Sequence, residues 1–153
     1  MLRHTSQVKA RARNPERFIE CFTQSIEKDF QNFFSKVYVG TERIEIENTP
    51  FSFLMVWNFY EIIGDGVVTI SKKNKIVTIS YLLNFSSYVL FWFLLSLLIV
   101  TIEVYNGLDD LSVLALPLLW GVIGLLFIII AQVRFRSKIV ESVKSSQGAV
   151  LTG

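Results

Sequence analysis

The sequence predicts a membrane protein of the α+β class. An amino-terminal amphipathic helix is expected to pack on a small antiparallel sheet of about four strands, followed by a two-helix transmembrane hairpin. Three observations predict this fold. Hydrophobic residues make up 52% of the 153 residues and charged residues only 18%, against about 25% charged in ordinary soluble domains. Positions 76–133 contain neither Lys nor Arg. Before this gap, the hydrophobic pattern changes from a helical period to strict alternation.

Two long apolar runs lie within the gap. They cover residues 82–105 and 112–133, and each reaches the length of about 20 residues that a spanning helix needs. Neither run shows the polar stripe of a helix that packs on a soluble core. The short connection between them contains the turn formers Asn106 and Gly107. We therefore expect two antiparallel neighbouring helices.

Basic residues flank this hairpin, whereas its connecting loop contains Asp109 and Asp110 and no basic residue. The flanking residues are Lys72, Lys73 and Lys75 before the first run, and Arg134, Arg136 and Lys138 after the second. By the positive-inside rule, the chain is predicted to cross the membrane twice with both termini in the cytoplasm. We expect a bacterial inner membrane. The alternative is an organelle inner membrane, with both termini in the matrix.

Residues 15–35 have the pattern of an amphipathic helix. Asn14 is a favoured N-cap, and Pro15 suits the first helical position. The apolar positions recur at steps of three and four, namely Ile19, Phe22, Ile26, Phe30, Phe33 and Val37. Two interpretations are open: this face packs on the following sheet, or it lies on the bilayer or a partner protein. The second makes Phe22, Phe30 and Phe33 candidate partner-binding residues.

After this helix the sequence alternates with a period of two. Residues 43–47 read RIEIE, and the segments 67–71 and 76–80 read VVTIS and IVTIS on either side of a Lys-rich turn. The apolar segment 51–59 is predicted to be a further strand, because it is too short to span a membrane as a helix. The expected result is an antiparallel meander. Its exposed edges are an alternative place for a partner.

These elements divide the chain into four parts. We predict a flexible basic tail at 1–14, a cytoplasmic α+β unit at 15–81, the transmembrane hairpin at 82–133 and a cytoplasmic tail at 134–153. A unit of about 65 residues is marginally stable alone. We therefore expect it to need the membrane, a partner or another copy of the chain.

The sequence offers no constellation of reactive residues. It contains one histidine, His4, and one cysteine, Cys21, which do not suffice for a nucleophilic triad or a classical zinc site. The net charge is +2, without the dense basic stripe that is typical of nucleic-acid-binding domains. We expect a protein that is not an enzyme, takes no cofactor or metal, and binds no nucleic acid.

The function expected from these features is that of a non-enzymatic accessory or assembly subunit of a larger membrane complex. One alternative is a homo-oligomeric channel or membrane-perturbing effector, and another is a membrane-tethered sensor of a lipid or small ligand. The expected partners are membrane lipids and either other membrane subunits or further copies of the chain. Basic residues near an anionic membrane each contribute about 1 kcal/mol. The candidate lipid-headgroup residues are Lys72, Lys73, Lys75, Arg134 and Arg136.

Overall fold

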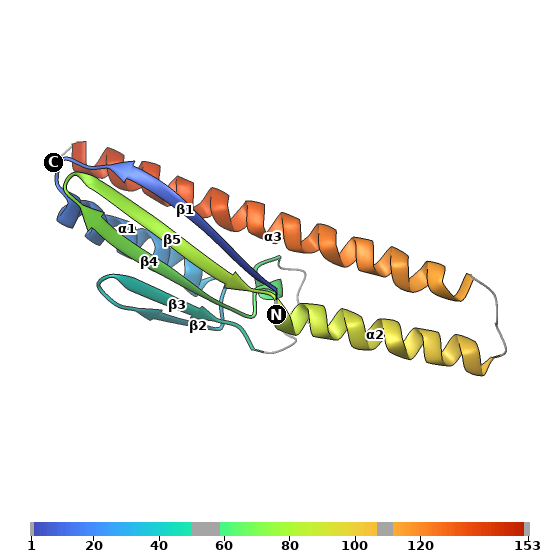
Figure 1. The fold of residues 1–153 in the computed structure, drawn as a ribbon. Coiled ribbons are helices and arrows are strands. Elements are labelled where there is room, and N and C mark those ends of the chain that lie inside the picture. The colour runs from blue at the N-terminus through green and yellow to red at the C-terminus, as the bar shows by residue number, and fades with distance from the viewer. Residues whose placement is uncertain (1, 50–58, 107–111, 152–153) are drawn as a thin grey trace.

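The computed structural model describes residues 2–49, 59–106 and 112–151. The protein has a sheet with two helices on one face, and a helical hairpin extends away from this sheet (Figure 1). The elements in chain order are β1 (Arg3–Arg11), α1 (Pro15–Gln31), β2 (Lys36–Val39), β3 (Arg43–Glu47), the 3-10 helix η2 (Phe59–Ile62), β4 (Asp65–Lys73), β5 (Ile76–Asn84), α2 (Ser86–Tyr105) and α3 (Ser112–Leu151).

The sheet is antiparallel and has five strands in the order β1-β5-β4-β3-β2. The predicted antiparallel sheet is thus confirmed, with one strand more than expected. The strands β4 and β5 have nine residues each and meet at a turn where Asn74 has a φ of 57°, a conformation that Asn tolerates better than most residues. The predicted strand at 51–59 lies outside the described residues, except for Phe59, which begins η2.

The additional strand is β1, which corrects the expectation of a flexible tail at 1–14. It pairs with β5 along its whole length, from Arg3 opposite Asn84 to Arg11 opposite Ile76. Its even-numbered residues face the helices, and of these only Val8 and Ala10 are apolar. Backbone pairing with a strongly hydrophobic neighbour therefore forms this strand, since its own apolar signal is weak.

The hydrophobic core lies between the sheet and two helices. Alternate residues of β3, β4 and β5 supply the sheet side, and both α1 and the second half of α3 cover them. Phe135 of α3 lies at the centre, with ring centroids 5.2 Å from Phe30 of α1 and 5.2 Å from Tyr81 of β5. Other core residues are Phe18, Phe22, Ile26, Ile44, Ile46, Val68, Ile70, Val77, Ile79, Leu83, Ile139 and Val143.

The helix α1 begins where the sequence predicts. The side chain of Asn14 accepts a hydrogen bond of 3.2 Å from the backbone N–H of Arg17, and Pro15 occupies the first turn. Asn14 thereby satisfies a donor that the first turn would otherwise leave unpaired. The four buried residues of α1 are Phe18, Phe22, Ile26 and Phe30, and they face the sheet and α3.

The two apolar helices differ from the prediction at their inner ends. The strand β5 includes Leu82 and continues to Asn84, so α2 begins four residues later than expected, at Ser86. The helix α3 has 40 residues and continues through most of the segment 134–153, where we expected a cytoplasmic tail into which the second helix extends by a few turns. Phe135, Ile139 and Val143 are buried, so the second half of α3 is part of the core of the α+β unit.

Both helices are long and apolar enough to cross a membrane. Only 6% of the most apolar window of α2 is buried, and 22% of that of α3. A helix in the core of a soluble protein would be mostly buried. The large exposed side chains of α2 and of the first half of α3 are almost all hydrophobic, among them Leu90, Phe93, Leu94, Leu97, Leu98, Leu118, Leu119, Val122, Leu125, Leu126 and Ile129.

Candidate functional site

Aromatic packing joins the two apolar helices. Trp92 of α2 stacks on Trp120 of α3, with ring centroids 5.3 Å apart and an interplanar angle of 22°. Gly124 lies against the same indole, since a Cβ at this position would lie 3.5 Å from Trp92 Cδ1. A Cβ at Gly121 would meet no described atom within 4 Å. Gly124 therefore packs within the hairpin, and Gly121 does not.

Two hydroxyl groups of α2, those of Ser96 and Thr101, are bonded within their own helix. Ser96 Oγ donates to the carbonyl of Trp92, and Thr101 Oγ1 donates to that of Leu97, both at 2.8 Å. Such bonds to the carbonyl four residues earlier satisfy a hydroxyl in an apolar environment. In a homo-oligomeric channel, hydroxyl groups such as these could line the pore. In one copy of the chain, however, both hydroxyl protons are already used in these hydrogen bonds.

A contact between η2 and α3 lies where the apolar part of α3 ends. The Tyr60 hydroxyl donates to the backbone carbonyl of Arg134 over 3.4 Å, and the Arg134 guanidinium carbon lies 4.5 Å from the centroid of the Phe59 ring. Burial raises the pKa of the Tyr60 hydroxyl above its ordinary value, which keeps it protonated as a donor. Tyr60 also stacks on Phe33 at 4.5 Å. These contacts join η2 to α3 and to the segment that directly follows α1.

The three phenylalanines proposed for partner binding lie in or beside the core. Phe22 and Phe30 are fully buried. Phe33 is half-buried against Tyr60. A rigid partner has no access to Phe22 or Phe30 in this arrangement. Of the two interpretations of the amphipathic helix, the contacts support packing on the sheet.

The five candidate lipid residues fall into two separate groups. Lys72, Lys73 and Lys75 lie at the turn between β4 and β5, whereas α2 begins at the opposite end of β5 (Figure 1). A strand rises about 3.3 Å per residue, so β5 places roughly 30 Å between this turn and α2. Lys72 forms an ion pair of 3.0 Å with Glu16. Of the five, only Arg134 and Arg136 adjoin the apolar helices.

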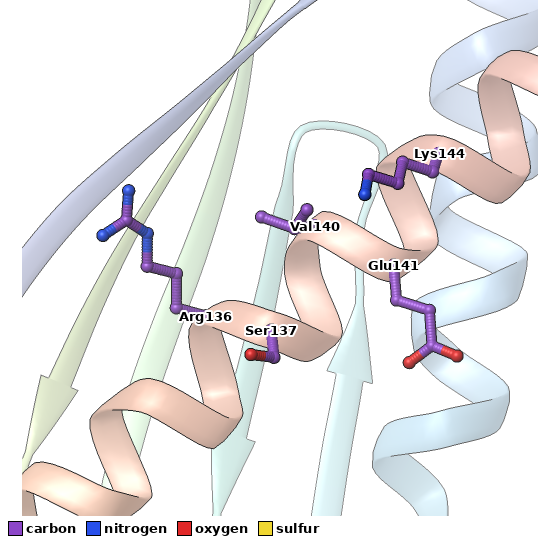
Figure 2. A pocket seen from close by; sticks show the side chains of 5 residues that line it. All are labelled: Arg136, Ser137, Val140, Glu141 and Lys144. Carbon is purple, nitrogen blue, oxygen red and sulfur yellow. The ribbon is translucent and has the colours of Figure 1, made fainter.

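A groove of about 390 Å³ runs along α3 beyond its apolar half, lined by Arg136, Ser137, Val140, Glu141 and Lys144. Figure 2 shows Arg136 and Val140 pointing to the side of α3 on which β1 runs, whereas α1 lies on the other side. Two contacts agree with this view. Gln147 Nε2 donates to the carbonyl of Arg11 at the end of β1 over 3.2 Å, and Lys138 lies 3.9 Å from Asp29 of α1.

Exposed basic residues gather at the end of the sheet farthest from α2. Lys9, Arg11, Arg13, Lys73 and Lys75 are all exposed. The backbone N–H of Ala12 donates to the carbonyl of Lys75 over 2.9 Å, which places the end of β1 beside the turn between β4 and β5. Among the described residues, none of these five basic side chains forms an ion pair. We call these five residues the basic end.

Sequence reasoning missed the basic end because it treated residues 1–14 as a tail. The usable signal was the alternation in residues 3–11, where Val8 and Ala10 share one face and every Lys and Arg has an odd number. In residues 2–49, 59–106 and 112–151, no three His, Cys, Asp or Glu side chains are grouped so that they could hold a metal ion.

Comparisons with known proteins assign no family. No family model matches the sequence, and searches of curated proteins and of solved structures find no match either.

Proposed function

We propose that this chain is a two-span membrane protein that serves as a non-enzymatic accessory or assembly subunit of a larger membrane complex. The hairpin of α2 and the first half of α3 crosses the bilayer, and the α+β unit lies in the cytoplasm. The observation that carries the proposal is the continuity of α3. One helix supplies both an exposed apolar surface and, through Phe135, Ile139 and Val143, part of the core of the α+β unit.

The continuity of α3 fixes the height and the orientation of the α+β unit above the membrane. A helix rises 1.5 Å per residue, so α3 is about 60 Å long, of which about half suffices for a bilayer core. The second connection is equally short. Only Phe85, which is buried, separates β5 from α2, and its carbonyl accepts the first helical bond from Val89 over 3.0 Å.

Two rigid connections suit a protein that presents a surface to a fixed neighbour. A flexibly tethered module would reach partners at many distances, and a linker would serve it better. The channel alternative has less support, because the hydroxyl groups of Ser96 and Thr101 donate within their own helix. The lipid-sensor alternative loses three of its five candidate residues to the distance across β5.

Intact-complex mass spectrometry after purification in mild detergent tests the proposal. We expect the chain to leave its native membrane with a second protein in fixed stoichiometry. Mixing tagged and untagged membranes before solubilisation is the control, because subunits that associate only after lysis would exchange between the two. A monomer or a homo-oligomer alone would contradict the proposed function.

A further inference from the structure

The strand β1 is one edge of the sheet, and its hydrogen-bonding pattern shows which backbone groups point away from it. The N–H of Ala12 donates to the carbonyl of Lys75, and the N–H of Phe85 donates to that of Leu2, over 2.9 and 3.0 Å. Both pairs continue the register of β1 with β5, so the even-numbered residues of β1 bond to β5. The N–H and carbonyl groups of the odd-numbered residues therefore point outward.

The side chains of the same odd-numbered residues give this edge a positive charge. Residues 3, 5, 7, 9 and 11 are Arg, Thr, Gln, Lys and Arg, and all five are exposed on the face of the sheet that α1 and α3 leave uncovered. The strand contains no acidic residue. Lys73 and Lys75 adjoin its far end. An incoming strand would thus meet outward backbone groups and a row of cations together.

One flank of the α3 groove lies on the same side of the molecule. The bond from Gln147 to the carbonyl of Arg11 places this flank of α3 beside β1 and limits the open edge to Arg3–Lys9. Arg136, Val140 and Lys144 line the groove. They follow one another at steps of four along the helix, so they share one flank (Figure 2). A strand added to β1 would point alternate side chains toward this flank, where two of the three residues are basic.

We propose that the edge of β1 binds an extended, acidic segment of a partner protein, which adds a sixth strand to the sheet. Hydrogen bonds to the backbone of the odd-numbered residues would form with a partner segment of almost any sequence. The basic side chains would favour segments that contain acidic residues. This inference deepens the proposed function and rests on it, since the segment belongs to the partner subunit.

Other occupants fit the edge less well. Two copies of β1 paired about Gln7 would bring Arg3 opposite Arg11, and like charges directly opposite each other are destabilising. Nucleic acid and anionic lipid match the charge but make no use of a row of alternating backbone donors and acceptors. The opposite edge, β2, has only four residues, and Lys36 and Tyr38 face Glu47 and Glu45. It therefore lacks both the length and the net positive charge.

The test uses the full chain in nanodiscs of zwitterionic lipid and a fluorescent seven-residue peptide of alternating Glu and Thr, with binding measured by fluorescence anisotropy. Gln7→Pro removes an outward N–H that β5 does not use, a position where edge strands accept proline. We expect at least tenfold weaker binding by Gln7→Pro and by the double variant Lys9→Glu/Arg11→Glu. Lys36→Glu, a charge reversal of the same kind on β2, should leave the affinity within about twofold.

A second peptide keeps the test independent of how Gln7→Pro folds. Methylation of the peptide's alternate backbone nitrogens blocks pairing along one edge only, so one of the two methylation patterns should abolish binding and the other should retain it. Equal binding of both patterns would overturn the proposal. So would tighter binding of a single-stranded oligonucleotide or of anionic vesicles that Gln7→Pro leaves unchanged. Because the peptide is tested on the isolated protein, this result is separate from the presence or absence of a native complex.

Discussion

Replacing Phe135 by Ala is expected to lower the free energy of unfolding of the α+β unit by about 3–5 kcal/mol. The side chain is fully buried, and its ring lies 5.2 Å from Phe30, 6.4 Å from Phe34 and 5.2 Å from Tyr81. Removing it leaves a cavity where α1, α3 and the sheet meet. A total stability of about 5–15 kcal/mol is usual for a domain, so this change removes a large share of it.

Pulse proteolysis in nanodiscs over a urea series measures this loss. Phe93→Ala is the matched control, since Phe93 is 62% exposed on α2 and its truncation leaves no protein cavity. If Phe135→Ala and the unaltered chain are cleaved at the same urea concentration, the second half of α3 does not belong to the core, and the rigid connection that supports the proposed function is lost.

Replacing Leu97 by Arg is expected to impair membrane integration strongly. Leu97 is 54% exposed and lies eleven residues after Ser86, which is about 16 Å along the helix and hence near the middle of a bilayer core of about 30 Å. An arginine at the centre of a spanning helix costs about 2.5–3.5 kcal/mol on insertion scales.

The fraction of protein that resists alkaline extraction measures this effect. Tyr38→Arg is the control, because Tyr38 is 51% exposed on β2, outside the apolar helices, and we expect no change from it. A helix that lies in water would gain solubility from Leu97→Arg. If Leu97→Arg is as resistant to alkaline extraction as the unaltered chain and is also more soluble, α2 does not span the membrane.

The sequence predicts most elements whose hydrophobic pattern is strong. The segments 43–47, 67–71 and 76–80 are parts of β3, β4 and β5, and Asn14 caps α1 as expected. The apolar helices are recognisable because an uncharged apolar run of about 20 residues is typical of a membrane span. Their inner boundaries are harder to predict, since Leu82 suits a buried strand as well as a helix.

The missed features depend on tertiary contacts. The sequence of β1 is mostly polar, but pairing with β5 and packing against α3 stabilise it as a strand. In α3, Phe135, Ile139 and Val143 recur at steps of four, but the charges at 134, 136 and 138 suggested the end of the span. The phenylalanines of α1 fit two interpretations equally well, and only the position of the sheet distinguishes them.

Lys72, Lys73 and Lys75 show how sequence distance differs from distance in space. These lysines are 7 to 10 residues from the predicted start of the first span at Leu82. As a strand, those residues separate the lysines from α2 by nearly the whole length of the sheet. The three lysines would lie near α2 only if residues 76–84 folded back on themselves. The register of β4 with β5 shows that these residues form a continuous strand instead.

We propose that α2 and α3 form a two-span hairpin with the α+β unit on the cytoplasmic side. Cysteine accessibility tests it directly, since Cys21 is the only native cysteine and Cys21→Ser gives a cysteine-free chain. Into this chain, Thr41→Cys places a thiol between β2 and β3, and Asn106→Cys places one at the end of α2; both positions are exposed. A membrane-impermeant maleimide should label Thr41→Cys only in inverted vesicles and Asn106→Cys only in right-side-out vesicles. Labelling of both positions from the same side would exclude a hairpin that crosses the membrane twice with the α+β unit in the cytoplasm.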